Sequence, residues 1–106
     1  MNRRLFAVLS LFALVLALPA FAAPDGTAIF KSKCTSCHGA DGAGQTPAGK
    51  MMKVKDLRSD AVQKKTDLDL TKTISGGKGK MPAYGKQLST ADVQAIIVHI
   101  RTLKAK

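Results

Sequence analysis

Three features of the sequence predict a small all-α domain built from three to five short helices. Helix-capping residues precede several segments, and the last segment carries apolar residues at helical spacing. No stretch alternates between polar and apolar residues as a half-buried strand does. Glycine-rich stretches separate the helical segments, and 106 residues without an internal repeat predict one domain.

The first 22 residues have the order of a secretory signal peptide. Two arginines precede an apolar run over residues 5–18, and Ala20-Phe21-Ala22 offers a small-x-small cleavage site. We therefore expect a signal peptide over residues 1–22 and a periplasmic domain over residues 23–106, or a cut one residue later, before Pro24. An uncleaved membrane anchor is the alternative, because the apolar run approaches the length of about 20 residues that spans a bilayer.

Four segments of the remaining chain carry the signals of helices. The expected helices cover residues 25–33, 56–63 or 59–63, 67–75 and 89–103. Their caps are Asp25, either Asp56 or Ser59, Thr66 with Asp69, and Ser89 with Asp92. Apolar positions are Leu68, Leu70 and Ile74 in the third helix, and Val93, Ile96, Ile97, Ile100 and Leu103 in the last. Gly26, near the start of the first helix, can let another helix approach closely.

The predicted domain has little material for a core of its own. Phe30 and Tyr84 are its only aromatic side chains, and both cysteines lie in one short motif. A domain of this size usually needs a disulfide, a metal or another staple. A large apolar cofactor would supply the missing core.

The motif Cys34-Thr35-Ser36-Cys37-His38 is the attachment signature of c-type haem. Each thiol can add across one vinyl group of haem, so that two thioethers fix the ring to the chain. The adjacent His38 is then directed at the iron. The sequence therefore predicts one covalently bound haem c, with Cys34, Cys37 and His38 in its site.

Two other uses of this motif are weaker. A redox dithiol normally belongs to a βαβ fold, which the sequence does not indicate. A zinc site needs a fourth ligand, but the chain has no further cysteine, and His99 is its only other histidine.

The stretch of residues 39–50 is rich in turn formers and is expected to wrap the His38 side of the haem. A metal-bound histidine normally donates its second ring N–H to an acceptor that fixes its orientation. Carbonyl groups near Pro47 are candidates for this acceptor, although Pro47 can equally be a simple turn former. The next apolar side chains, Met51, Met52, Val54 and Leu57, are candidates for lining the haem.

Residues 76–85 contain too many glycines for a helix or strand, and they place Met81 at the tip of a loop before Pro82. A thioether is a soft ligand that suits haem iron in an electron-transfer site. We therefore expect Met81 to be the second iron ligand. Met51, Met52, His99 or an open position are the alternatives, because methionine is ordinarily a packing residue.

The charge of the chain is one-sided. The formal net charge is +10, every acidic residue is an aspartate, and loss of Arg3 and Arg4 would leave about +8. Lysines flank both chemical centres, at positions 31, 33, 50, 53, 55, 78, 80 and 86. This pattern favours redox partners with acidic docking faces. Nucleic acid is not an expected partner, because no aromatic residues interleave the lysines.

These motifs together resemble a class I cytochrome c of the short bacterial kind over residues 24–104. The resemblance rests on Gly26, Phe30, the Cys34–Gly39 motif, Met81-Pro82 and the closing helix that ends at Ile100-Arg101-Thr102-Leu103. It implies the small cytochrome c fold, in which short helices surround one haem and the first and last helices cross. It also implies His38 and Met81 as axial ligands of the iron, a Pro47 carbonyl that orients His38, and Tyr84 near the haem edge.

One position departs from this family, because His99 stands where the last helix often carries an aromatic residue. A histidine on an apolar helix face is usually a packed, hydrogen-bonded residue, and we interpret His99 in this way. The resemblance implies a monomeric, soluble one-electron carrier and not an enzyme. A peroxidase or a gas-binding haem protein would need an open distal site, and a sensory haem module would normally be fused to another domain.

Overall fold

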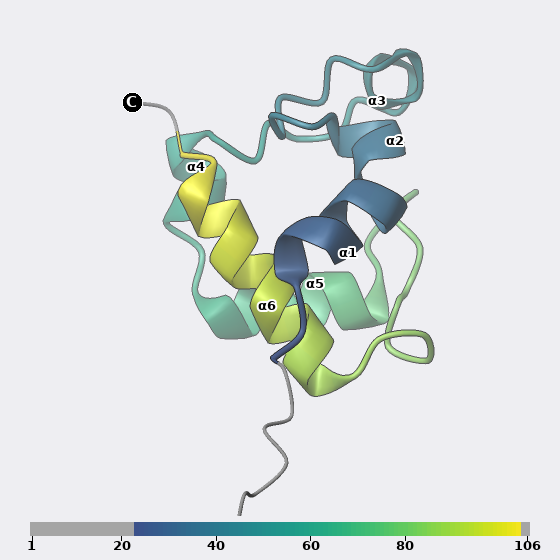
Figure 1. The fold of residues 1–106 in the computed structure, drawn as a ribbon. Coiled ribbons are helices and arrows are strands. Elements are labelled where there is room, and N and C mark those ends of the chain that lie inside the picture. The colour runs from purple at the N-terminus through teal and green to yellow at the C-terminus, as the bar shows by residue number, and fades with distance from the viewer. Residues whose placement is uncertain (1–22, 105–106) are drawn as a thin grey trace, which may run out of the picture.

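The computed structural model describes residues 23–104, and this part of the chain contains six helices (Figure 1). They are α1 (Gly26–Lys33), α2 (Thr35–His38), α3 (Pro47–Met52), α4 (Asp60–Gln63), α5 (Asp67–Gly76) and α6 (Thr90–Thr102). No strand forms within these residues, apart from an isolated bridge between Lys78 and Met81. The all-α prediction is therefore confirmed. Residues 1–22, where the signal peptide is expected, lie outside the described part.

The predicted helices begin at predicted caps. The carboxylate of Asp25 accepts a hydrogen bond from the Ala28 amide at 3.1 Å, and Ser59 rather than Asp56 caps α4. At α6 the full capping box forms, because Ser89 and Asp92 each accept a hydrogen bond from the other's amide. These caps satisfy amide groups that a helix N-terminus leaves without partners.

The structure has more helices than the three to five expected, because two short helices were not predicted. The helix α2 is the haem motif itself, separated from α1 at Cys34. The helix α3 lies in and after the stretch that was expected to be all turns. Its start is nevertheless encoded, because Thr46 caps it through the Gly49 amide and Pro47 occupies the first helical position.

The crossing of α1 and α6 is the most extensive helix contact within residues 23–104, and Figure 1 shows the two helices lying across one another. A Cβ atom on Gly26 would collide with the Ala95 carbonyl, so the expected close approach is confirmed. At the same crossing, His99 shares a hydrogen bond of 3.0 Å with the Thr27 hydroxyl. Its ring centroid lies 4.7 Å from that of Phe30, so His99 is a packed residue as interpreted.

The hydrophobic core fills the space between α1, α5 and α6. Its buried members are Phe30, Val62, Leu70, Ile74, Leu88, Val93, Ile96, Ile97 and Ile100. Leu103 packs on this core, as the apolar stripe of α6 predicts. Leu68 does not, because it lies on the outer face of α5 and is 62% exposed.

The end of α6 is tied to the segment between α4 and α5 by one arginine. The guanidinium of Arg101 donates to the carbonyls of Gln63 and Lys65 at 2.9 and 2.7 Å, and to the Asp67 carboxylate at 2.8 Å. The Gln63 side chain donates in turn to the Leu57 and Ile100 carbonyls.

Across residues 23–104, no helix has both the length and the apolar character needed to cross a bilayer.

Candidate haem-binding site

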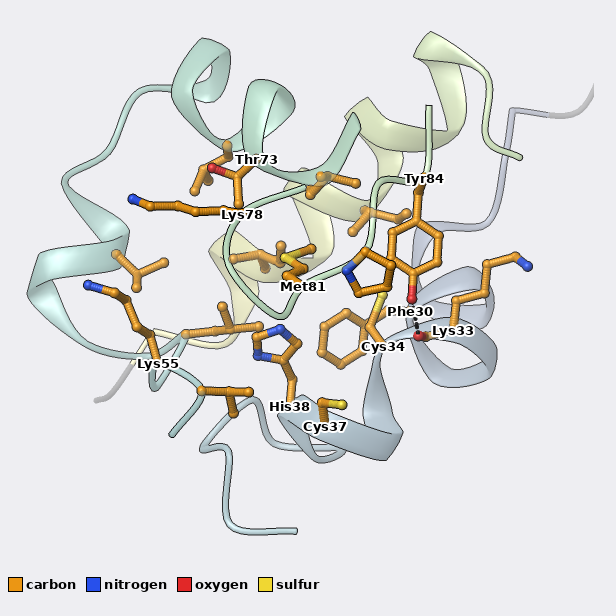
Figure 2. A pocket seen from close by; sticks show the side chains of 18 of the residues that line it. Phe30, Lys33, Cys34, Cys37, His38, Lys55, Thr73, Lys78, Met81 and Tyr84 are labelled. Atoms are coloured by element: carbon orange, nitrogen blue, oxygen red, sulfur yellow. Dashed lines mark hydrogen bonds between the residues drawn. The ribbon is translucent and has the colours of Figure 1, made fainter. Parts of the chain in front are cut away.

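One apolar cavity of about 290 Å³ opens between α1, α2, α5, α6 and the loop that follows α5 (Figure 2). All four predicted site residues, Cys34, Cys37, His38 and Met81, line it. Its apolar walls come from Phe30, Met52, Val54, Leu57, Val62, Leu70, Ile74, Pro82, Tyr84, Ile96 and Ile100. The fold therefore brings together residues that lie more than forty positions apart in the sequence.

Cys34 lies where α1 ends and α2 begins. Its amide donates to the Phe30 carbonyl at 2.8 Å, and its carbonyl accepts from the His38 amide at 2.9 Å. Both Cys34 and Cys37 are free thiols and partly buried. Burial raises the pKa of the Cys34 thiol, and the charge of Lys33 opposes this shift. In residues 23–104 no three histidine, cysteine or aspartate side chains are placed so that they could hold a metal ion, so the zinc interpretation gains no support.

His38 ends α2 and points into the cavity (Figure 2). Burial lowers the pKa of its imidazole, and the backbone of Lys55 opposes this shift. The Nδ1 atom of His38 is buried and has no hydrogen-bond partner among residues 23–104. The hydrogen bond to a Pro47 carbonyl that the family resemblance implied is therefore not formed in this structure. A buried polar atom without a partner costs about 1–3 kcal/mol, so this imidazole suits a site that a bound group completes.

The loop before α3 holds the His38 side of the cavity, as predicted. The Thr46 hydroxyl lies 2.8 and 3.0 Å from the carbonyls of Ser36 and Cys37, and the Gly44 amide donates to the His38 carbonyl at 2.7 Å. A Cβ atom on Gly49 would collide with the Cys37 carbonyl. Sequence reasoning missed Thr46 and Gly49 as positioning residues, although the Thr-Pro pair at 46–47 is a recognisable helix start.

Met81 lies on the opposite side of the cavity from His38 (Figure 2). Its amide and carbonyl exchange two hydrogen bonds with Lys78, of 2.9 and 3.1 Å, which close a tight turn. Met81 is partly buried and packs against the core. Of the alternative ligands, Met51 is 78% exposed and His99 lies at the helix crossing, and neither lines the cavity. Met52 does line it, although it is 41% exposed.

The loop that carries Met81 is anchored beyond the turn. The amides of Tyr84 and Gly85 donate to the carbonyls of Ile74 and Ser75, both at 3.0 Å. The Tyr84 hydroxyl reaches the Lys33 carbonyl at 3.3 Å, so this side chain bridges the loop and the end of α1. Burial, together with the nearby cysteine sulfurs, raises the pKa of Tyr84.

Several known proteins resemble this chain, and they agree on its family. The sequence model of the family described as cytochrome C oxidase, cbb3-type, subunit III matches residues 21–100. Cytochrome c6 of Gloeothece citriformis is 34% identical over 85 residues, which cover 77% of this chain and 74% of that protein. Cytochrome c6 of Picosynechococcus is 32% identical over 114 residues, which cover 94% of this chain and 92% of that protein.

A longer relative and a solved structure extend the same likeness. The cbb3-type cytochrome c oxidase subunit FixP of Azorhizobium caulinodans is 34% identical over 83 residues, which cover 77% of this chain but 27% of FixP. The structure of the KustC0563 c-type cytochrome superposes with a TM-score of 0.71 at 25% identity, covering 76% of this chain and 99% of that one. This chain therefore belongs to the family of cytochrome c domains that the matching sequence model describes, and it is a small class I c-type cytochrome whose cofactor is covalently bound haem c.

Proposed function

We propose that this protein is an exported one-electron carrier that holds a single haem c between His38 and Met81. The observation that carries the proposal is the convergence of four side chains on one apolar cavity: two free thiols, an imidazole and a thioether. Cys34 and Cys37 would hold the haem by two thioethers, because each S–H can add across a vinyl C=C bond so that an S–C bond forms and the proton ends on the neighbouring carbon. No oxidant or reductant is consumed in this attachment.

Haem supplies an iron that takes up and releases one electron. With haem bound, His38 and Met81 would both hold the iron and leave no place on it for a substrate, so we infer a carrier rather than an enzyme. The apolar walls exclude water and keep the ligands fixed between the two oxidation states. Thr46 and Gly49 hold the His38 side, while the turn at Lys78 holds the Met81 side.

The charge of the described surface favours acidic redox partners. All three ion pairs within residues 23–104 use arginine, at Arg58 and Arg101, so the lysines of this part form no ion pairs. Lys33 and Lys80 line the cavity, and Lys86 follows in the same loop as Met81. Unpaired lysines beside the cavity can steer an acidic partner to the haem edge without a long-lived complex.

The ligand assignment is tested by comparing the absorption spectrum of the oxidised Met81→Ala protein with that of the Met51→Ala protein. Met81→Ala is expected to remove the thioether-to-iron charge-transfer band of the oxidised protein and to lower the reduction potential. Met51→Ala is the matched control, because Met51 is exposed and outside the cavity. If Met52→Ala removes the band and Met81→Ala does not, the distal ligand is Met52 and the assignment is wrong.

A further inference from the structure

The cavity has an unusual charge balance for an apolar site. Six lysines line it and no acidic residue does; they are Lys33, Lys53, Lys55, Lys65, Lys78 and Lys80. None of the six forms an ion pair with an acid of residues 23–104. Like charges gathered at one cavity repel each other, and an anion placed among them relieves this repulsion.

Two of these lysines share one edge of the cavity. Figure 2 shows Lys55 extending from the His38 side and Lys78 from the Met81 side, with both side chains directed to the edge opposite the two cysteines. Lys33 extends on the cysteine side, near Tyr84, and its ammonium group lies 3.5 Å from the Gln87 side-chain oxygen. The cavity therefore has a thiol edge and, across from it, a cationic edge.

The haem ring has two edges of different chemistry that match these two edges of the cavity. Its two vinyl groups lie on one side of the ring, and its two propionate carboxylates lie on the other. With the vinyl carbons bound to Cys34 and Cys37, the propionates would face the edge of the cavity opposite the two cysteines. We propose, on the basis of the function proposed above, that Lys55 and Lys78 bind the two haem propionates and clamp them from opposite walls of the cavity.

If this clamp forms, the lysines near the cavity fall into two groups with different functions. With haem bound, the charges of Lys55 and Lys78 would offset those of the two propionates, whose negative charge otherwise favours the oxidised iron. Each cation near the iron favours the reduced state and raises the reduction potential. Lys80 and Lys86 keep their charge for solvent and for partners. Lys78 and Lys80, only two positions apart, are thus expected to act differently.

The test is redox-difference infrared spectroscopy of the holoprotein with ¹³C-labelled propionates. Lys55→Met and Lys78→Met are each expected to shift the labelled carboxylate bands and to lower the reduction potential. Lys33→Met is the matched control, because Lys33 lines the same cavity but extends on the cysteine side. The carboxylate bands of the Lys33→Met protein are expected to coincide with those of the unmodified protein.

Two readouts separate the possible failures. Carboxylate bands unmoved by both Lys55→Met and Lys78→Met, or moved equally by Lys33→Met, would overturn the clamp. The thioether-to-iron band reports on the proposed function separately, because it depends on Met81 and not on the lysines. The clamp also requires Lys80→Met to alter the salt dependence of electron transfer more than Lys78→Met does, and the reverse order would contradict it.

Discussion

At the scale of single residues, Gly49 sets how closely α3 can approach the helix that carries His38. A Cβ atom there would collide with the carbonyl of Cys37 and lie 2.6 Å from that of Gly44. Backbone atoms cannot yield as the end of a flexible side chain can. We predict that Gly49→Ala lowers the free energy of unfolding by about 1–3 kcal/mol, the usual cost of overpacking.

The matched control for this change is Gly76→Ala. Gly76 is the last residue of α5, has no positive φ, and a Cβ atom there would meet nothing within 4 Å. Because alanine is the better helix former, Gly76→Ala is expected to leave the free energy of unfolding unchanged or to raise it by no more than about 1 kcal/mol. Urea unfolding measures both substitutions. Equal effects of the two substitutions would show that Gly49 is not required for the approach of α3.

At the scale of elements, Arg101 joins the C-terminal end of α6 to the segment between α4 and α5. Its planar guanidinium serves two carbonyls and one carboxylate at once, which the single ammonium of a lysine cannot reproduce. We predict that Arg101→Lys costs about 1.5–3 kcal/mol of stability, the range for hydrogen bonds to charged groups.

Urea unfolding of the holoprotein measures this cost, and Arg58→Lys is its control. Arg58 pairs with Asp56 and Asp41 at the surface, where ion pairs contribute little. Its substitution is expected to leave the midpoint almost unchanged. An Arg101→Lys protein as stable as the control would mean that core packing alone holds the end of α6 in place.

The elements also show what the sequence could predict. Caps such as Asp25 and Ser89, and the apolar stripe of α6, are local signals, and the helices that they predict form as expected. Cys34, Cys37, His38 and Met81 could be predicted as one candidate site because each has distinctive chemistry or a distinctive setting, and the structure brings all four to one cavity. These signals depend on neighbours in the sequence and not on the fold.

What sequence reasoning missed depends on contacts between distant segments. The six residues of α3 are too few to show a helical period, so only the Thr46-Pro47 start distinguishes them from a turn. Nothing near Arg101 in the sequence indicates that it reaches Gln63 and Lys65. The separation of Lys55 and Lys78 from Lys33 becomes visible only in the folded cavity (Figure 2).

At the scale of the whole molecule, we expect the distribution of charge to control how fast redox partners associate with the protein. The formal net charge is +10, and within residues 23–104 the arginines, but not the lysines, are paired with aspartates. In the proposed carrier, the exposed lysines beside Met81 would carry the field that a partner meets. Lys104, after α6, is also exposed but does not line the cavity.

Two small oxidants of opposite charge test this field directly. Oxidation of the reduced protein by the anion ferricyanide is expected to slow as ionic strength rises, by about tenfold or more from very low to moderate salt. Oxidation by the cation tris(phenanthroline)cobalt(III) is expected to quicken, because salt screens a repulsion instead of an attraction over roughly 10 Å at 0.1 M. Lys80→Glu and Lys86→Glu should weaken both trends more than Lys104→Glu, while the reduction potential changes little. A local field must act most strongly through the charges nearest the site of electron transfer. Rates that do not depend on salt, or equal effects at all three positions, would therefore show that the Met81 loop is not the docking surface.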